Sequence, residues 1–136
     1  MRIPMRHPLP VLLTVLVAGC TSIRTTSPKE IPLGTDFEVR AMDPVHVSGT
    51  PVTLTVVSIA DSRCPSDVTC VSAGDAVVAL VLGGSQADTL HTMPTLRRTT
   101  TFAGHRVELV DVRPYPRRSA GDVLVQTAVI RVLPER

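Results

Sequence analysis

The residues best able to do chemistry are concentrated in one short stretch, residues 61–75 of the 136-residue chain. Cys64 and Cys70 lie there with five residues between them, a spacing that can serve a disulfide, a metal site or a reactive thiol. Zinc-binding cysteine pairs are usually closer together, and no nearby histidine pair completes four ligands. A nucleophilic cysteine needs a histidine partner and electropositive surroundings. Because Pro65 follows the first cysteine and a second cysteine matches it, the pattern favours a disulfide.

Asp61 and Arg63 lie beside the first cysteine and allow two interpretations. In the local one, Asp61 accepts hydrogen bonds from backbone N–H groups of the loop and pairs with Arg63. In the other, the loop recognises a partner with Arg63 as its charged tip, or Asp61, Asp67 and Asp75 gather around Ca²⁺. Calcium takes about six to eight oxygen ligands, and these carboxylates lack the alternate spacing of calcium loops. The local interpretation is therefore favoured.

The same stretch resembles a signature of small bacterial envelope proteins of β type that are uncharacterised. Residues 61–65 read Asp-Ser-Arg-Cys-Pro, a second cysteine follows at position 70, and residues 73–74 read Ala-Gly. The resemblance implies a small β fold and no particular reaction, because no activity is attached to that family. Relatives often carry tryptophan where this chain has Ser72, so an aromatic contact made there by relatives is not expected here.

Two further groups of residues could bind a ligand. His91 and Met93 share one side of an expected strand, and with His105 they could form a soft copper site. Such pairs often arise by chance and methionine is ordinarily core filler, so no metal site is assigned. Residues 113–118 form a proline-stiffened loop in which Arg113 and Tyr115 suit contact with a protein or an anionic glycan. A solvated connection between strands is the alternative.

Signatures of catalysis are missing from the sequence. It contains no glycine-rich phosphate loop, no His-Glu-x-x-His, and no Ser-His-Asp order or paired-carboxylate pattern, so we expect neither an enzyme nor a cofactor. Nucleic-acid binding is not expected either. The net charge is +2, and without Arg2 and Arg6 of the leader the basic and acidic residues are equal in number. Phosphate binding needs an excess of Lys and Arg, and the three aromatic residues provide no stacking platform.

The elements that must position these residues are expected to be short β-strands. The chain is rich in Val and Thr, whose branched side chains favour strands over helices. Alternating or continuous apolar runs bounded by turn residues occupy residues 36–42, 52–59, 76–82, 105–112 and 123–133. A weaker strand is expected at 88–93, and 99–102 are ambiguous. The pattern predicts an all-β fold, an antiparallel β-sandwich of about six to eight strands, with an immunoglobulin-like form or a small barrel as variants.

The first twenty residues have the parts of a targeting segment. Arg2 and Arg6 precede an apolar run at 9–18. As a helix this run rises only about 15 Å, too little to span a bilayer core of about 30 Å. A basic start, a short apolar run and small residues at its end are typical of a secretory signal. Residues 17–20 read Val-Ala-Gly-Cys and resemble the lipobox of bacterial lipoproteins. The resemblance implies that Cys20 becomes the acylated N-terminus, with an ordinary cleaved signal as the alternative.

A lipid on Cys20 accounts for all three cysteines, because Cys64 and Cys70 are then left to pair outside the cytosol, where disulfides persist. The expected organisation is a signal peptide at 1–19, a lipidated tether at 20–34 and a β-sandwich domain at 35–136. Thr21 follows the lipobox cysteine. Within the lipoprotein resemblance, this implies an outer-membrane location with the domain facing the periplasm.

The expected function is that of a membrane-anchored cell-envelope lipoprotein that acts as a non-catalytic binding or structural module. Its membrane contact is the lipid on Cys20, and its partner is a protein or an envelope polymer reached by the disulfide loop and residues 113–118. Two other hypotheses stay open. One is a copper-handling lipoprotein that uses His91, Met93 and His105, and the other is a small hydrolase without a familiar motif.

Overall fold

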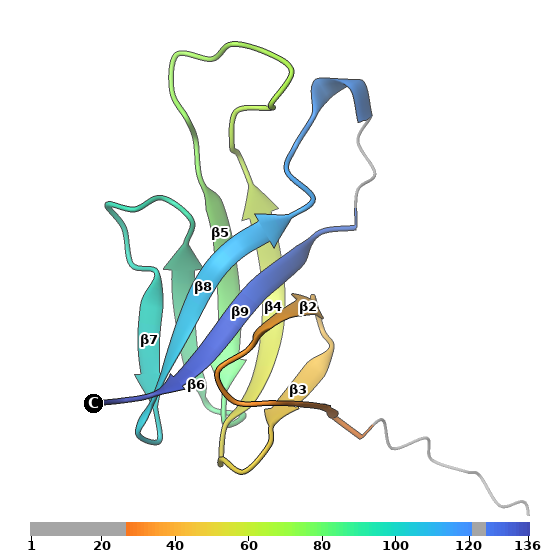
Figure 1. Cartoon of the computed structure of the whole chain (residues 1–136). Coiled ribbons are helices and arrows are strands. Elements are labelled where there is room, and N and C mark those ends of the chain that lie inside the picture. The colour runs from red at the N-terminus through yellow and green to blue at the C-terminus, as the bar shows by residue number, and fades with distance from the viewer. Residues whose placement is uncertain (1–26, 121–124) are drawn as a thin grey trace, which may run out of the picture.

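The computed structural model describes residues 27–120 and 125–136, which form two β-sheets packed face to face (Figure 1). The larger sheet has the strand order β1-β3-β4-β5-β6 and the smaller one β2-β9-β8-β7. The elements are β1 (Lys29–Ile31), β2 (Asp36–Arg40), β3 (Pro44–Val47), β4 (Thr53–Asp61), β5 (Ala76–Leu82), β6 (Gln86–His91), β7 (Thr99–Phe102), β8 (His105–Arg113), a 3₁₀ helix (Arg118–Ala120) and β9 (Thr127–Pro134). The predicted all-β, sandwich-like fold is confirmed.

The predicted strand number and pairing are wrong in two respects. The described residues hold nine strands rather than six to eight, and β1 runs parallel to β3, so the larger sheet is mixed rather than antiparallel. β1 also lies inside the range expected to be a tether, so folded structure begins before Thr35. Three residues are too few to show a two-residue period. β1 becomes a strand through its pairing with β3 and the burial of Ile31.

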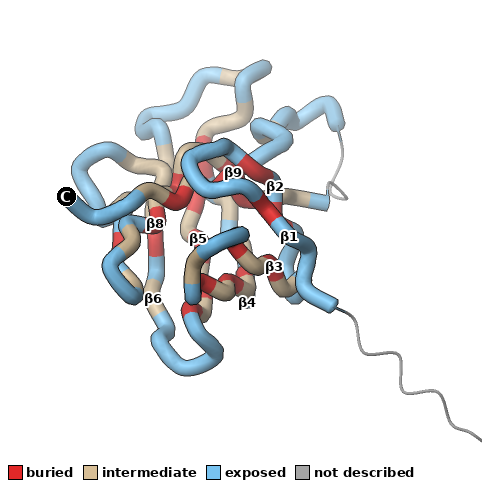
Figure 2. Tube along the Cα trace, turned by 60° about the horizontal axis from the view of Figure 1, so that its bottom comes forward, coloured by how far each residue is buried: buried red, intermediate tan, exposed pale blue. Residues whose placement is uncertain are grey.

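The core lies between the two sheets and is almost entirely aliphatic (Figure 2). Every second residue of β5 is buried, and in β2 the buried residues are Phe37 and Val39. Because side chains alternate between the two faces of a strand, one face of each sheet enters the core. Phe102 packs on the edge of this cluster, and its ring fills the space that a side chain at Gly83 would need.

Two β-bulges interrupt the long strands. The register of β4 against β5 shifts between Val56 and Ser58, and the register of β8 against β9 shifts between Leu109 and Asp111. A bulge changes the direction of the side chains next to it. In β8 the bulge brings Val112 into the core after Leu109 and leaves Asp111 partly exposed. The Asp111 carboxylate accepts a hydrogen bond from Arg63 Nη1 at 3.1 Å.

Three loops lie at one end of the sandwich, the top of Figure 1, which we call the loop end. They are the β4–β5 loop (62–75), the β6–β7 loop (92–98) and the β8–β9 loop (114–126, of which 121–124 are not described). They share one end because the pairs β4–β5, β5–β6, β7–β8 and β8–β9 are all antiparallel. Within the described ranges, the protein has no helix whose length and apolar character would let it cross a membrane.

Candidate binding surface at the loop end

The β4–β5 loop is closed by the predicted disulfide between Cys64 and Cys70. At the base of the loop, the N–H of Ser62 donates to the carbonyl of Asp75 at 2.8 Å. Gly74 lies beside this bond with a φ of +69°, and a Cβ at this position would overlap the Ser62 carbonyl oxygen. Glycine is therefore required here for both its backbone conformation and its lack of a side chain.

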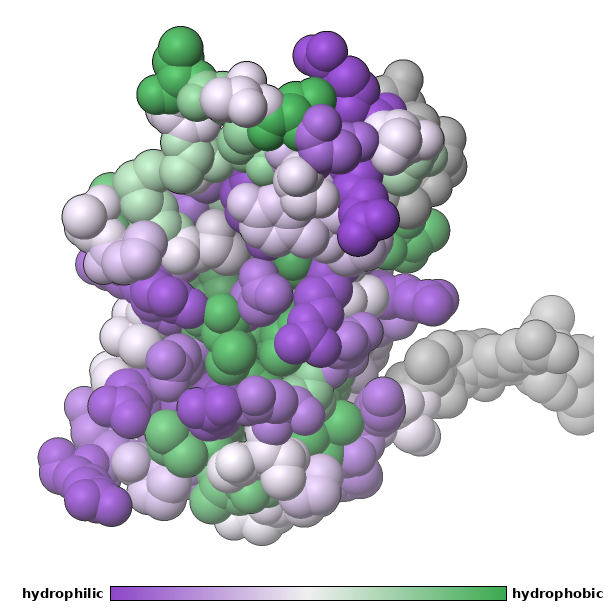
Figure 3. All heavy atoms as spheres, turned by 45° about the horizontal axis from the view of Figure 1, so that its top comes forward, coloured by the Kyte–Doolittle hydropathy of each residue, from purple (hydrophilic) through white to green (hydrophobic). Residues whose placement is uncertain are grey.

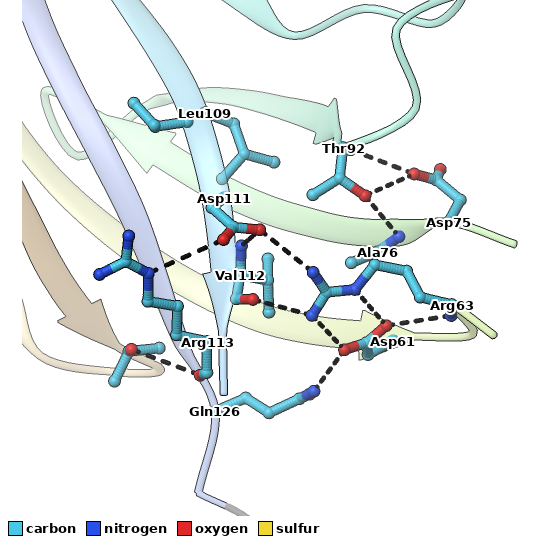
Figure 4. Close-up of polar contacts among 12 residues, drawn as sticks. Asp61, Arg63, Asp75, Ala76, Thr92, Leu109, Asp111, Val112, Arg113 and Gln126 are labelled. Atoms are coloured by element: carbon cyan, nitrogen blue, oxygen red, sulfur yellow. Dashed lines mark hydrogen bonds and ion pairs between the residues drawn. The ribbon is translucent and has the colours of Figure 1, made fainter. Parts of the chain in front are cut away.

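Arg63 is buried at the base of this loop, with a side chain only 6% exposed. Its Nε donates to Asp61 Oδ1 at 2.8 Å and its Nη2 to Asp61 Oδ2 at 2.7 Å, while its backbone N–H also reaches Oδ1 at 3.1 Å (Figure 4). The predicted local pairing is therefore confirmed. The alternative, with Arg63 as an exposed charged tip, is wrong, because its guanidinium points inwards to a carboxylate that is itself only 4% exposed.

The same guanidinium joins the two sheets. Nη1 of Arg63 donates to Asp111 Oδ1 at 3.1 Å and Nη2 to the carbonyl of Val112 at 2.8 Å, both on β8 (Figure 4). From the segment before β9, Gln126 Nε2 donates to Asp61 Oδ2 at 2.6 Å. Burial alone would raise the pKa of Asp61, but the hydrogen bonds and charge of Arg63 outweigh it and lower that pKa. Both members of the buried pair are thus ionised and well bonded.

The β8–β9 loop packs against the disulfide loop. Tyr115 covers Arg63, whose guanidinium carbon lies 4.4 Å from the centre of the ring, a cation–π distance. The N–H of Ser66 donates to the carbonyl of Pro116 at 3.0 Å. The two loops that the sequence singles out separately are therefore adjacent and directly bonded.

Asp67 makes the strongest connection between these loops. Its Oδ1 accepts the N–H of Arg118 at 2.8 Å and its Oδ2 accepts the N–H of Ser119 at 3.0 Å, at the start of the 3₁₀ helix. These backbone hydrogen bonds stabilise the ionised carboxylate and lower the pKa of Asp67 to about 2. From the sequence, Asp67 is a candidate only for calcium binding. Its role between the loops is not evident there, because the two donors are 51 and 52 positions away.

The joined loops present a mixed apolar and cationic surface, which we call the loop surface and define as residues 65–71 and 113–120. Val71 is fully exposed and Tyr115 is partly exposed. Arg117 and Arg118, on the same loop as Tyr115, are exposed as well. Figure 3, in which the top of Figure 1 comes forward, shows hydrophobic and hydrophilic groups next to each other over these loops.

The four predicted contact residues divide into two kinds. Arg113 and Tyr115 are exposed and belong to the loop surface. Asp61 and Arg63 are buried and lie beneath it, so they cannot touch a partner directly. Their burial fits their hydrogen bonds, because the Arg63 guanidinium bonds the Asp61 carboxylate of one sheet and the Val112 carbonyl of the other. They support the surface and do not form it.

Asp75 fixes the third loop. Its Oδ1 accepts hydrogen bonds from the N–H and hydroxyl of Thr92 (Figure 4). The N–H of Met93 also donates to Oδ1, and Oδ2 lies 2.6 Å from His91 Nδ1. Burial raises the pKa of Asp75, but the hydrogen bonds from His91, Met93 and Thr92 prevail and lower it. The carboxylate therefore ties the end of the β4–β5 loop to the start of the β6–β7 loop. Between the loops, Gly74, Met93 and Tyr115 line a shallow groove.

The edge of β8 continues beyond its partner β7 at this end. Pairing with β7 reaches only as far as Glu108. Further along, Arg98 Nη2 donates to the carbonyls of Leu109 and Val110 at 3.1 and 2.8 Å. The guanidinium of Arg63 takes another carbonyl of the same strand. Arginine side chains thus bond the carbonyls of β8 in the part of its edge that β7 does not cover.

The residues considered for metal binding are not brought together. His91 is engaged by Asp75 at the loop end, whereas His105 begins β8 at the opposite end and its Nδ1 contacts the carbonyl of Ala103. Asp61, Asp67 and Asp75 each bind different donors. Among residues 27–120 and 125–136, no group of three or more His, Cys, Asp or Glu is placed to hold a metal ion.

The predicted signal peptide at 1–19 and the predicted lipidation site Cys20 lie outside the described residues. Comparison with known proteins gives no family assignment: no protein-family model, no curated protein and no solved structure matches the chain.

Proposed function

We propose that this protein is a lipid-anchored domain of the cell envelope that binds a partner, without catalysis, through the loop surface. The lipobox-like residues 17–20 support the anchor, and an outer-membrane position facing the periplasm is part of the proposal. The disulfide fits an exported protein, since disulfides persist in oxidising compartments. The strand arrangement is further proposed to be an immunoglobulin-like variant of the sandwich.

The observation that carries the binding proposal is the pair of hydrogen bonds from Arg118 and Ser119 to Asp67. They hold the exposed β4–β5 and β8–β9 loops in one arrangement in the absence of a partner. A preorganised surface loses less conformational entropy on binding than two independent loops would lose. Tyrosine and arginine, which are prominent here, are the residue types that most often dominate binding energy at interfaces.

The partner is proposed to be a protein or an envelope polymer with apolar and anionic groups close together. Val71 and Tyr115 offer apolar contact, and Arg117 offers a charged hydrogen-bond donor beside them. Charge alone does not define the partner, because the basic and acidic residues outside the leader balance. Short-range contacts with the loop surface would then give most of the specificity.

The anchor is tested by mass spectrometry of the mature N-terminus from membrane fractions. We expect an acylated Cys20 as the first residue, and a Cys20→Ala variant that keeps its leader and is not acylated. Recovery of the unmodified chain from the soluble fraction would contradict this part of the proposal.

The binding role is tested by quantitative affinity capture from envelope extracts, with partners measured by mass spectrometry. Tyr115→Ala and Arg117→Glu should each reduce recovery of the same specific partner about tenfold, as expected for central interface residues. Arg106→Glu is the matched control, because Arg106 is an exposed arginine near the start of β8, at the end of the sandwich opposite the loops. Equal recovery by all four proteins, wild type included, would show that the loop surface does not bind the partner.

A further inference from the structure

We propose that the Cys64–Cys70 disulfide is a redox-controlled latch for the loop surface. When the disulfide is closed, it holds Asp67 against the β8–β9 loop, and when a dithiol reduces it, that loop is released. This inference rests on the proposed function, because it describes how the same surface would be regulated. It is carried by the position of Asp67 between the two cysteines.

The hydrogen bonds between the two loops all start inside the ring that the disulfide closes, whereas the contact of Tyr115 with Arg63 lies outside it. Ser66 donates to Pro116, and Asp67 accepts from Arg118 and Ser119. Among the described residues these are the hydrogen bonds that join the β4–β5 loop to the β8–β9 loop. The placement of residues 116–119 thus depends on the conformation of residues 65–69.

Little besides the disulfide fixes that conformation. Within the ring, the backbone hydrogen bond shown by the structure is from the N–H of Val68 to the carbonyl of Pro65, at 3.3 Å. Ser66, Asp67 and Thr69 are exposed, so burial does not hold them either. Breaking the cross-link restores backbone freedom to this segment, and the few hydrogen bonds of Ser66, Asp67 and Val68 must then oppose that entropy without it.

The rest of the fold is independent of the ring. The base of the loop is closed by hydrogen bonds from Ser62 to Asp75 and from Cys64 to Ala73. The buried pair of Asp61 and Arg63 precedes the ring, and the hydrophobic core contains no cysteine among the described residues. Reduction is therefore expected to release a surface loop and leave the sandwich folded.

The exchange chemistry is open to a dithiol, because Cys70 is exposed. A thiolate of the dithiol attacks Cys70 Sγ, which forms a mixed disulfide and breaks the bond to Cys64. Cys64 leaves as a thiolate and takes up a proton. The second thiol of the reductant then displaces Cys70, so that two electrons pass to the protein and the reductant becomes a cyclic disulfide. Exchange with an oxidised dithiol protein in the envelope reverses these steps and closes the latch.

The latch is tested by NMR amide exchange on the full-length protein, oxidised or reduced with dithiothreitol. The amides of Arg118 and Ser119 should exchange at least about tenfold faster after reduction, because each loses a charge-assisted hydrogen bond. The amide of Gly34, which donates to Val132 at 2.9 Å in the folded sheet, should be unchanged. Asp67→Ala should produce the same acceleration with the disulfide intact, whereas Asp36→Ala on β2, an exposed carboxylate paired with Arg131, should not.

Two results would overturn the latch. Equal exchange of the Arg118 and Ser119 amides in both redox states would show that the disulfide does not control the loop. Faster exchange of the Gly34 amide after reduction would show that the disulfide supports the whole fold instead. A Cys64→Ser, Cys70→Ser variant provides the permanently open form for the same measurement. Since no partner is present, the latch can fail while the binding proposal survives, and the reverse also holds.

Discussion

Two arginine–aspartate pairs in this molecule have the same local chemistry and different surroundings. Arg63 bonds both oxygens of Asp61 at 2.8 and 2.7 Å, and Arg131 bonds both oxygens of Asp36 at 2.5 and 2.9 Å. The side chains of the first pair are 6% and 4% exposed, whereas those of the second are 37% and 42% exposed. The first pair lies beneath the loop surface, and the second bridges β2 and β9 on the outside of the smaller sheet.

The difference shows that the surroundings of an ion pair determine its structural weight. An exposed pair exchanges water contacts for protein contacts and gains little, especially in salt. Water cannot solvate the members of a buried pair, so removing one partner leaves the charge of the other uncompensated. Arg63 also bonds Asp111 and the carbonyl of Val112 across the sandwich. The stability of the loop end therefore depends on the Arg63 guanidinium more than the stability of the smaller sheet depends on Arg131.

The largest expected effect is that of Arg63→Met. This change leaves the Asp61 carboxylate buried with Gln126 as a side-chain donor, and it should lower the free energy of unfolding by about 3–5 kcal/mol. Urea unfolding followed by far-UV circular dichroism measures it. Arg131→Met is the matched control and should give no resolvable change in the same titration. Similar losses for the two variants would contradict the distinction between the pairs.

The next effect compares two glycines. Gly74→Ala at the loop end should cost about 2–4 kcal/mol, because its φ of +69° disfavours a side chain and a Cβ would overlap the Ser62 carbonyl. Gly49→Ala in the β3–β4 turn has a similar φ of +74° but open space, so about 1 kcal/mol is expected. Thermal unfolding of both variants measures the difference. If Gly49→Ala were the more destabilising, steric crowding at Gly74 would not be limiting.

The contributions of the two ion pairs to stability should also differ in their dependence on pH and salt. The pKa of Asp61 is lower in the folded state than its unfolded value of about 4, so its stabilisation is complete above that pH and is lost as pH falls through the folded pKa. Asp61→Asn should therefore flatten the dependence of unfolding free energy on pH below about 4. The pKa of Asp36 is also lowered by Arg131, but salt near 1 M should remove that contribution and spare that of Asp61. Urea titrations at several pH values and two salt concentrations are the measurement. Equal salt sensitivity of the two contributions would count against a buried pair.

The smallest expected effect concerns Tyr115. Its ring covers Arg63, which is already paired, and the ring is partly exposed, so Tyr115→Leu should lower stability by only about 0.5–1 kcal/mol. Tyr115→Phe keeps the ring over the guanidinium and should match wild type in urea unfolding. A loss in Tyr115→Phe as large as that in Tyr115→Leu would assign the effect to the hydroxyl instead of the cation–π contact.

Sequence alone predicts what depends on neighbours along the chain. The alternation in residues 36–42 predicts β2, which the structure ends at Arg40, and the apolar run at 76–82 predicts β5. The disulfide and the pairing of Asp61 with Arg63 also follow from short spacing, and both are present. Each of these features is formed by residues that are close in sequence, so composition and period contain enough information.

Sequence alone does not predict what depends on distant partners. β7, left ambiguous in the sequence, is a strand because it pairs with β8, and β1 forms through its pairing with β3. The contacts of Arg63 depend on Asp111, 48 positions away and next to a bulge in β8. The role of Asp67 depends on a loop still further along the chain. Only the three-dimensional arrangement shows that the two candidate loops form one surface.

The arginine-capped edge of β8 has a consequence for the behaviour of many copies of this chain. An open strand edge is a template on which another polypeptide can add a strand, and repeated addition leads to fibres. Here the carbonyls of Leu109 and Val110 are already bonded by Arg98, and another carbonyl by Arg63. The Arg98 guanidinium also places positive charge where an incoming strand would dock. Molecules crowded together are thus protected from polymerising through this edge.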